Sequence, residues 1–227
     1  MRPALLSLVP LALLGIATWL FHVYPWDLEA SGAYYDDVSN TWHLRNHAPW
    51  RGLYDYGQHP ALIVSFFGLV GFVASFFIDA LKPYRRRSIY LLLVLLLGPG
   101  LLINGIFKEY WGRPRPRDTT PFDGKYAYEK VLTYDASSPG KSFPSGHASM
   151  GFYFMCFYFI FRQRSWRIAS LLFGLAFGIV MGWARVVQGG HFASDVVFSA
   201  GMTFLSAVAL AYILKLNREI YSQTERN

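Results

Sequence analysis

The chain has 227 residues, of which 53% are hydrophobic and only 15% are charged. Soluble domains carry about 25% charged residues, so this composition excludes an ordinary soluble globular domain and indicates a membrane protein. The 21 Lys and Arg residues exceed the 14 Asp and Glu residues. They are distributed between hydrophobic runs and do not form one patch, which argues against binding to nucleic acid.

Six apolar runs are predicted to cross the membrane as helices, because their length and composition match a hydrocarbon core. They cover residues 4–22, 60–80, 88–108, 147–161, 168–185 and 195–214. The sequence therefore predicts an all-α polytopic membrane protein that forms one integral membrane domain over residues 1–227. The first run also resembles a signal peptide, but it is long and no clear cleavage site follows, which favours an uncleaved anchor.

The segment between the first two runs, residues 23–59, is polar and rich in tryptophan and tyrosine. These side chains settle at the headgroup level of a bilayer. We therefore expect short interfacial helices in this outer loop, where they would shape the entry to a site. His43 and His47 are four residues apart and could form a metal pair on a helix. No cysteine or acidic partner pattern lies nearby, so exposed interfacial histidines are favoured.

Basic residues predict the orientation of the chain. Eleven of the 21 Lys and Arg residues lie in the termini, including Arg2, Arg218 and Arg226, and in the short turns around Arg85 and Arg164. Residues 23–59 contain two arginines against five acidic residues. The positive-inside rule then places both termini in the cytoplasm.

The third run ends in the basic sequence KEYWGRPRPRD, from Lys108 to Asp118. Gly98, Pro99 and Gly100 interrupt the same run and are expected to kink or loosen its helix. The basic cluster falls on the predicted outer side, against the positive-inside rule. Charges at a membrane boundary are costly and usually functional, so the cluster predicts an anion held at the membrane surface.

A second group of unusual residues is the tetrapeptide Pro144-Ser145-Gly146-His147, which precedes an apolar run expected to be helical. The first turn of a helix presents unpaired backbone N–H groups and is a site for anions. Ser145 can cap the helix, Gly146 lets a ligand approach the backbone, and His147 can supply a proton near neutral pH.

A third group follows the fifth run, where His191 and Asp195 are four residues apart. On a helix that begins near Gly190, the two side chains would share a face, and the carboxylate would accept a hydrogen bond from the imidazole. The other ring nitrogen would then be free as a nucleophile. His147 would be available to protonate the leaving oxygen.

The predicted topology brings the ends of the third, fourth and fifth runs to one face of the membrane. The candidate anion-binding residues at this face are Lys108, Arg115, Ser145, Gly146 and Arg185. Lysine acts as a point charge and arginine as a planar fork of donors, a combination that suits the several oxygens of a phosphate.

Three motifs in this order resemble those of the type 2 phosphatidic acid phosphatase (PAP2) superfamily. The first is a lysine, six residues and Arg-Pro, here Lys108 to Pro116, and the second is Pro-Ser-Gly-His. The third runs from Arg185 through His191 to Asp195. Ala184 stands where the family usually has serine or threonine, which puts one supporting hydrogen bond in doubt.

The resemblance implies that His191 attacks phosphorus to form a phosphohistidine, that Asp195 orients it, and that His147 is the general acid. The phosphate oxygens would be held by Lys108, Arg115, Arg185 and the backbone at Ser145 and Gly146. The implied enzyme is a lipid phosphatase that needs no metal or other cofactor, in a bacterial inner membrane with its active site facing the periplasm. Lipid A phosphate is the favoured substrate. The alternatives are undecaprenyl diphosphate, which is an isoprenoid phosphate, and the phospholipid phosphatidylglycerol phosphate.

Three alternatives remain at this point. The enzyme could transfer the phosphoryl group to a second lipid in place of water. The protein could transport an anion without turnover, although transport does not require an oriented histidine–aspartate pair. The side chains of His147, His191 and Asp195 could also bind a metal as two histidines and one carboxylate, but the three cations nearby would repel it.

Overall fold

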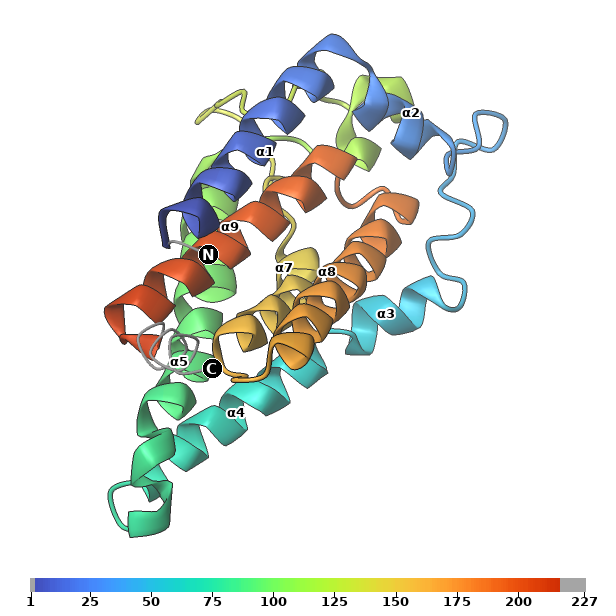
Figure 1. Ribbon diagram of the computed structural model, residues 1–227. Helices are drawn as coiled ribbons and strands as arrows, with labels where there is room; N and C mark the ends of the chain where they lie inside the picture. Colours follow the sequence, from blue (N-terminus) through green and yellow to red (C-terminus); the bar gives the residue numbers. More distant parts are fainter. Residues whose placement is uncertain (1–2, 217–227) are drawn as a thin grey trace.

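The computed structural model describes residues 3–216, and helices dominate it throughout (Figure 1). The longer α-helices are α1 (Pro3–Val23), α4 (His59–Ala74), α5 (Arg85–Leu95), α8 (Arg164–Val187) and α9 (Ala193–Ile213). The shorter ones are α2 (Trp26–Gly32), α3 (Trp50–Tyr56), α6 (Lys108–Tyr110) and α7 (Gly146–Phe152). A π-helix, η2 (Leu96–Phe107), and four 3-10 helices, η1 (Asp79–Tyr84), η3 (Pro116–Asp118), η4 (Thr120–Phe122) and η5 (Tyr153–Phe159), complete the set. Residues 3–216 contain no β-strand, in agreement with the all-α prediction.

Five stretches of the described chain are long and apolar enough to cross a membrane. They are Leu6–Val23, Trp50–Ala74, Asp79–Tyr110, Arg164–Val187 and Ala193–Ile213. The expected fourth span, 147–161, is not among them, because it consists of the short helix α7 followed by the 3-10 helix η5. Six spans therefore stay a prediction. So does the cytoplasmic placement of the termini, since Arg2, Arg218 and Arg226 lie outside the described residues.

The Gly98-Pro99-Gly100 sequence changes the helix type, as expected from its composition. Helix α5 ends at Leu95 and the chain continues as the π-helix η2. Proline has no N–H to donate, so a regular hydrogen-bond pattern cannot pass through Pro99. The side-chain amide of Asn104 donates to the Pro99 carbonyl at 2.6 Å and satisfies this acceptor. The π-helix thus fixes Asn104 one turn before Lys108.

Glycines on α8 allow the segment from α7 to η5 to pack closely against it. Gly174, Gly178 and Gly182 recur every four residues, which is the spacing of a small-residue face between membrane helices. A side-chain carbon at Gly178 would overlap the ring of Phe152, and one at Gly174 would overlap the backbone at Met155. These contacts run antiparallel, so the start of α7 lies toward the end of α8.

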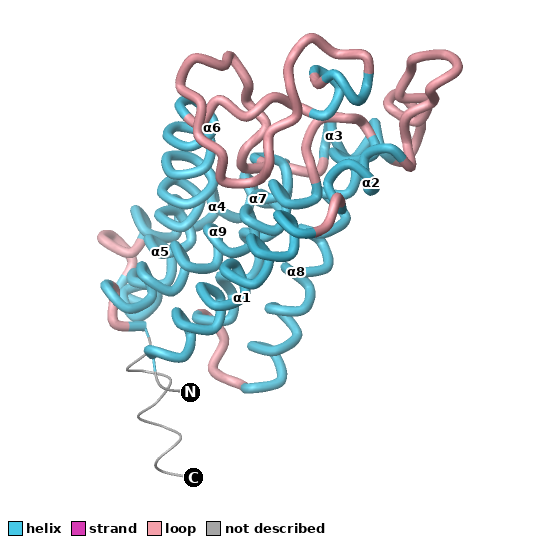
Figure 2. Tube along the Cα trace, turned by 90° about the horizontal axis from the view of Figure 1, so that it is seen from above, coloured by secondary structure: helices cyan, strands magenta, loops and turns pink. Residues whose placement is uncertain are grey.

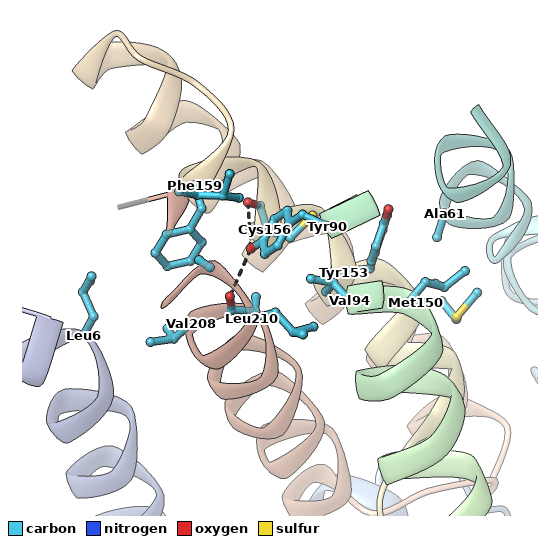
Figure 3. Packing of buried hydrophobic residues seen from close by; sticks show 14 residues of the cluster. Leu6, Ala61, Tyr90, Val94, Met150, Tyr153, Cys156, Phe159, Val208 and Leu210 are labelled. Atoms are coloured by element: carbon cyan, nitrogen blue, oxygen red, sulfur yellow. Dashed lines mark hydrogen bonds between the residues drawn. The ribbon is translucent and has the colours of Figure 1, made fainter. Parts of the chain in front are cut away.

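Buried residues from several helices hold this arrangement together. The hydroxyl of Tyr90 on α5 lies 3.3 Å from the carbonyl of Cys156 and 3.2 Å from that of Ala207 (Figure 3). The three residues belong to α5, η5 and α9. One buried polar group therefore ties three helices together inside an otherwise apolar cluster. The long connections, with α2, α3 and α6, gather at one end of the helices (Figure 2).

Candidate active site

His191 lies in the turn between α8 and α9 and is buried. Helix α9 begins at Ala193, whereas the sequence predicted a helix from near Gly190 that would include both His191 and Asp195. The difference has a local cause, because Asp195 accepts a hydrogen bond of 2.8 Å from the Phe192 backbone N–H and so caps the helix after His191. His191 and Asp195 therefore do not share a helix face.

The imidazole of His191 has a different partner from the one the spacing predicted. Its Nδ1 lies 2.6 Å from the carbonyl oxygen of Ser142 and 3.7 Å from the Asp195 carboxylate. Because a carbonyl can only accept, Nδ1 must carry the proton in this contact. The other ring nitrogen, Nε2, then has the free lone pair that nucleophilic attack requires. The expected tautomer is thus present, but Ser142 fixes it.

The environment of His191 favours its neutral form. Burial is the main cause that lowers its pKa to about 3, and the nearby cations Arg185 and Lys108 lower it further. The negative charge of Asp195 opposes these effects without overcoming them. A neutral imidazole is the nucleophilic form, so His191 is ready to react at physiological pH.

Asp195 is fully buried and forms an ion pair with Arg113, a residue for which the sequence indicated no specific role. Arg113 donates to Asp195 at 2.6 Å and to Asp27 on α2 at 2.8 Å. Ser142 Oγ donates to the other Asp195 oxygen at 2.6 Å. Burial by itself would lower the pKa of Arg113, but the Asp195 and Asp27 carboxylates raise it above its ordinary value. One guanidinium is thus shared by two carboxylates, and the hydroxyls of Ser142 and Ser194 donate to the carboxylate oxygens of Asp195 and Asp27.

The start of α7 forms a second part of the site. Ser145 is the N-cap, and its Oγ accepts from the Ala148 backbone N–H at 3.4 Å. The Ser145 backbone N–H donates to the Asp195 carbonyl at 3.3 Å, which places the Pro-Ser-Gly-His motif beside the first turn of α9. A side-chain carbon at Gly146 would overlap the Asn104 amide.

Asn104 also positions the first cation. Its Oδ1 accepts a hydrogen bond of 3.3 Å from Lys108 Nζ, while its Nδ2 is held by the Pro99 carbonyl. Asn104 belongs to none of the three sequence motifs. Its position one helical turn before the motif lysine is the only sequence signal that could have indicated this role.

Arg185 closes the other side of the site at the end of α8. Its guanidinium donates to the side-chain oxygen of Gln188 and lies 4.4 Å from the centre of the Tyr54 ring. A side-chain carbon at Gly190 would overlap this guanidinium. Among the described residues, the buried Nε atoms of Arg185 and Arg115 have no hydrogen-bond partner. Both are therefore donors available to an oxyanion.

His147 lies under an aromatic side chain of helix α3. The Tyr54 ring stacks on the imidazole with centroids 4.7 Å apart and an angle of 18°. Burial, followed by the charges of Arg185 and Lys108, lowers the pKa of His147 to about 4, below the near-neutral value expected from the sequence. The negative charge of a bound phosphate would oppose these cations and favour the protonated ring. The structure thus brings every predicted site residue into one connected region and adds Tyr54, which the sequence analysis assigned only to the interfacial aromatic segment.

Ala184, His43 and His47 do not contribute to the site in the way their sequence positions allowed. Ala184 is buried in α8 and offers no hydroxyl to the site. His43 and His47 lie in turns, with His47 Nδ1 2.7 Å from the His43 carbonyl. Within residues 3–216, no cluster of three or more His, Cys, Asp or Glu side chains is arranged to hold a metal ion.

Comparison with known proteins gives the family of the chain. The PAP2 superfamily matches residues 87–219. A lipid A 4'-phosphatase of Francisella tularensis subsp. novicida (strain U112) is 28% identical over 206 residues, which cover 88% of this chain and 92% of the relative. A lipid A 4'-phosphatase of Rhizobium leguminosarum is 36% identical over 51% of each chain. Phosphatidylglycerophosphatase B of Bacillus subtilis (strain 168) is 30% identical over 52% of this chain and 56% of its own.

No solved structure matches the chain significantly. The family match covers more than half of the chain and includes the Lys108–Pro116, Pro144–His147 and Arg185–Asp195 motifs. The chain therefore belongs to the PAP2 superfamily.

Proposed function

We propose that the protein hydrolyses the phosphate of a membrane-anchored lipid through a phosphohistidine at His191. Membership of the PAP2 superfamily makes it a phosphatase. The observation that carries the proposed mechanism is the buried His191 imidazole, whose Nδ1 is fixed by the Ser142 carbonyl so that Nε2 has a free lone pair. Donors without a partner among the described residues, on Arg115 and Arg185, belong to the same region.

In the first proposed step, Nε2 of His191 attacks phosphorus and the bond between phosphorus and the lipid oxygen breaks. That oxygen takes the electron pair and a proton, which His147 supplies. Water then attacks the phosphohistidine and His147 accepts its proton. The bond between Nε2 and phosphorus breaks, its electron pair returns to Nε2, and phosphate leaves. Asp195 lies 3.7 Å from His191 Nδ1 and stabilises the positive charge that the ring acquires during attack.

The phosphate oxygens gain negative charge in the transition state and are bound by fixed donors. We assign this role to Lys108, Arg115 and Arg185, together with the backbone N–H of Gly146. The Ser145 N–H, which was also expected to bind phosphate, already donates to the Asp195 carbonyl. Lys108 is positioned by Asn104 and Arg185 by Gln188. Because these donors are already in place, the site does not need to reorganise during the reaction.

The location of the site supports a lipid substrate. Lys108 and Arg185 lie within the last three residues of candidate spans, and Asp195 lies in the first turn of another. A phosphate bound there would be close to the membrane surface, while its lipid chains remain in the bilayer. From the distribution of basic residues, we place this end in the periplasm and the protein in a bacterial inner membrane.

Lipid A phosphate is the proposed substrate, because the relative that matches over most of both chains is a lipid A 4'-phosphatase. The test compares initial rates on lipid A, undecaprenyl diphosphate, phosphatidylglycerol phosphate and phosphatidic acid in one detergent. We expect lipid A to react fastest and EDTA to leave the rate unchanged. A water-soluble phosphate ester that reacts as fast as every lipid would refute the lipid assignment. Transfer of labelled phosphate to a second lipid would identify a phosphotransferase.

A further inference from the structure

A pocket of about 130 Å³ with a strongly basic lining adjoins the candidate phosphate site. Five arginines line it: Arg45, Arg51, Arg115, Arg117 and Arg185. We call it the arginine pocket. Arg115 and Arg185 belong to the phosphate-binding motifs, whereas Arg45, Arg51 and Arg117 belong to none of the three motifs. The pocket therefore holds more positive charge than the motif residues account for.

Specific hydrogen bonds fix the backbone at Arg45 and Arg117 and the guanidinium of Arg185. The buried Gln188 amide donates to the carbonyl oxygens of Arg45 and Trp50, each at 3.1 Å, and its oxygen accepts from Arg185. The Arg117 backbone N–H donates to the Gly189 carbonyl at 3.2 Å. Two separate chain segments, residues 45–50 and the one at Arg117, are thus fastened to the turn after α8, which makes the pocket a built feature of the fold.

The charges in the pocket are incompletely compensated. Arg51 forms a pair of 2.7 Å with Asp55. Arg117 Nε lies 3.8 Å from Asp118, a loose ion pair beyond hydrogen-bond distance. No ion pair to Arg45 occurs among residues 3–216. Burial, followed by the charges of Arg115 and Arg45, lowers the pKa of Arg117. Repulsion between these like charges would be relieved by a bound anion.

One phosphate does not use all of these donors. A phosphate monoester carries at most two negative charges and three terminal oxygens. Lys108, Arg115 and Arg185 already provide three cations for it. Arg45 and Arg117 add two guanidinium groups, each with a fork of N–H donors suited to a further oxyanion. The pocket that joins them to Arg115 and Arg185 places this second anion next to the first.

We propose that Arg45 and Arg117 form a second oxyanion subsite that binds another acidic group, a phosphate or carboxylate, on the same lipid molecule. This inference rests on the proposed function and narrows its substrate class to lipids with two or more acidic groups in the head. The sugar or diphosphate head of the lipid would then be held at two points, which orients the scissile phosphate toward His191.

The test uses a lipid disaccharide that carries two phosphates and its monophosphorylated analogue with the same acyl chains. We expect Arg45→Gln and Arg117→Gln each to lower the ratio of kcat/KM for the two lipids, bisphosphate over monophosphate, by about tenfold, because a charge-assisted contact is lost. The control Arg164→Gln changes an exposed arginine at the opposite end of α8 and should keep the wild-type ratio. An equal loss on both lipids, or a ratio that no pocket variant changes, would overturn the subsite.

Two further experiments complete the test. One shows whether the second anion belongs to the substrate or to a neighbouring phospholipid, and the other tests the subsite even if the proposed catalytic activity is absent. The assays are repeated with and without an anionic phospholipid, and an arginine dependence that appears only with that phospholipid would refute a subsite for the substrate's own second group. Failure of the proposed function looks different, since the wild type would release no phosphate from either lipid. In that case the subsite is tested by lipid binding to His191→Ala, measured by tryptophan fluorescence. Adding Arg45→Gln to this variant should reduce the ratio of the affinities for the bisphosphate and the monophosphate lipid about tenfold. An unchanged ratio contradicts the subsite.

Discussion

The proton on Nδ1 of His191 decides which nitrogen can attack phosphorus. Its contact of 2.6 Å with the Ser142 carbonyl requires a proton there, and burial lowers the pKa to about 3. Because the lowered pKa keeps the ring neutral down to about this value, His191 should be a neutral ring with its one proton on Nδ1 at pH 5, where a free histidine with a pKa of about 6.5 is mostly charged.

Nitrogen NMR of the ¹⁵N-histidine protein in detergent tests this prediction, with the His191→Gln spectrum as the assignment control. The expected signals at pH 5 are those of a neutral ring with hydrogen on Nδ1. A cationic ring at pH 5, or a neutral ring with hydrogen on Nε2, would contradict the assigned role.

Arg113 should act on the reaction through Asp195 without touching the substrate. It contributes a charged fork to Asp195 and Asp27, and a lysine cannot reproduce both contacts. Arg113→Lys should lower kcat on the order of tenfold with little change in KM, since a transition-state contact is weakened. Arg113→Ala should destabilise the fold by about 3–5 kcal/mol, because it leaves two buried carboxylates unpaired.

Steady-state kinetics of Arg113→Lys on lipid A, with the exposed Arg162→Lys as a matched control, measures the split between kcat and KM. An increase in KM at constant kcat would mean that Arg113 binds substrate directly. Thermal unfolding of the alanine variant measures the effect on stability.

At the scale of helices, the glycine face of α8 sets the distance between the motifs. A methyl group at Gly178 would overlap the buried Phe152 ring. Gly178→Ala should therefore destabilise the protein by about 1–3 kcal/mol through overpacking. Gly15→Ala is the matched control, because nothing lies within 4 Å of a side-chain carbon there. The midpoint of thermal inactivation in detergent should fall for Gly178→Ala only, and equal shifts in both variants would show that this contact does not limit packing.

Much of the helical arrangement could be predicted from the sequence, because apolar runs and breaks at glycine and proline are local signals. The predicted fourth run did contain helix, but its 3-10 second half and limited length are set by packing against α8. The prediction that His191 lies in a helix was wrong. A spacing of four residues between His191 and Asp195 fits two residues on one helix face, but it also fits a histidine that precedes a helix capped by the aspartate. The positive φ of 63° at Gly189 marks the turn that separates α8 from α9.

The candidate site shows a similar division. The charged motif residues could be identified from their order and spacing. Arg113 lies 86 residues from Asp27 and 82 from Asp195, so no local pattern connects these buried partners. Tyr54 of α3 likewise contacts His147 only because the folded chain brings α3 to the start of α7. By contrast, the recurrence of glycine in α8 is visible in the sequence and would have predicted its close packing.

At the scale of the whole molecule, the distribution of basic residues predicts that the site faces the outside. In a Cys156→Ser background, a cysteine at Tyr126 should react with an impermeant label added to intact spheroplasts, whereas one at Arg164 should react only after lysis. Tyr126 is in the long loop before α7 and Arg164 begins α8. Labelling at position 164 but not at position 126 in intact spheroplasts would show that the chain has the opposite orientation.

The central claim is that His191 attacks phosphorus and His147 protonates the leaving oxygen. Rapid reaction with a nitrophenyl phosphate, followed by alkaline quenching and mass spectrometry, locates the phosphoryl group directly. The account predicts phosphohistidine at position 191 in the wild type and in His147→Ala, because nitrophenolate leaves without a proton, and none in His191→Ala. A phosphoryl group on His147, or a phosphoenzyme in His191→Ala, would contradict it.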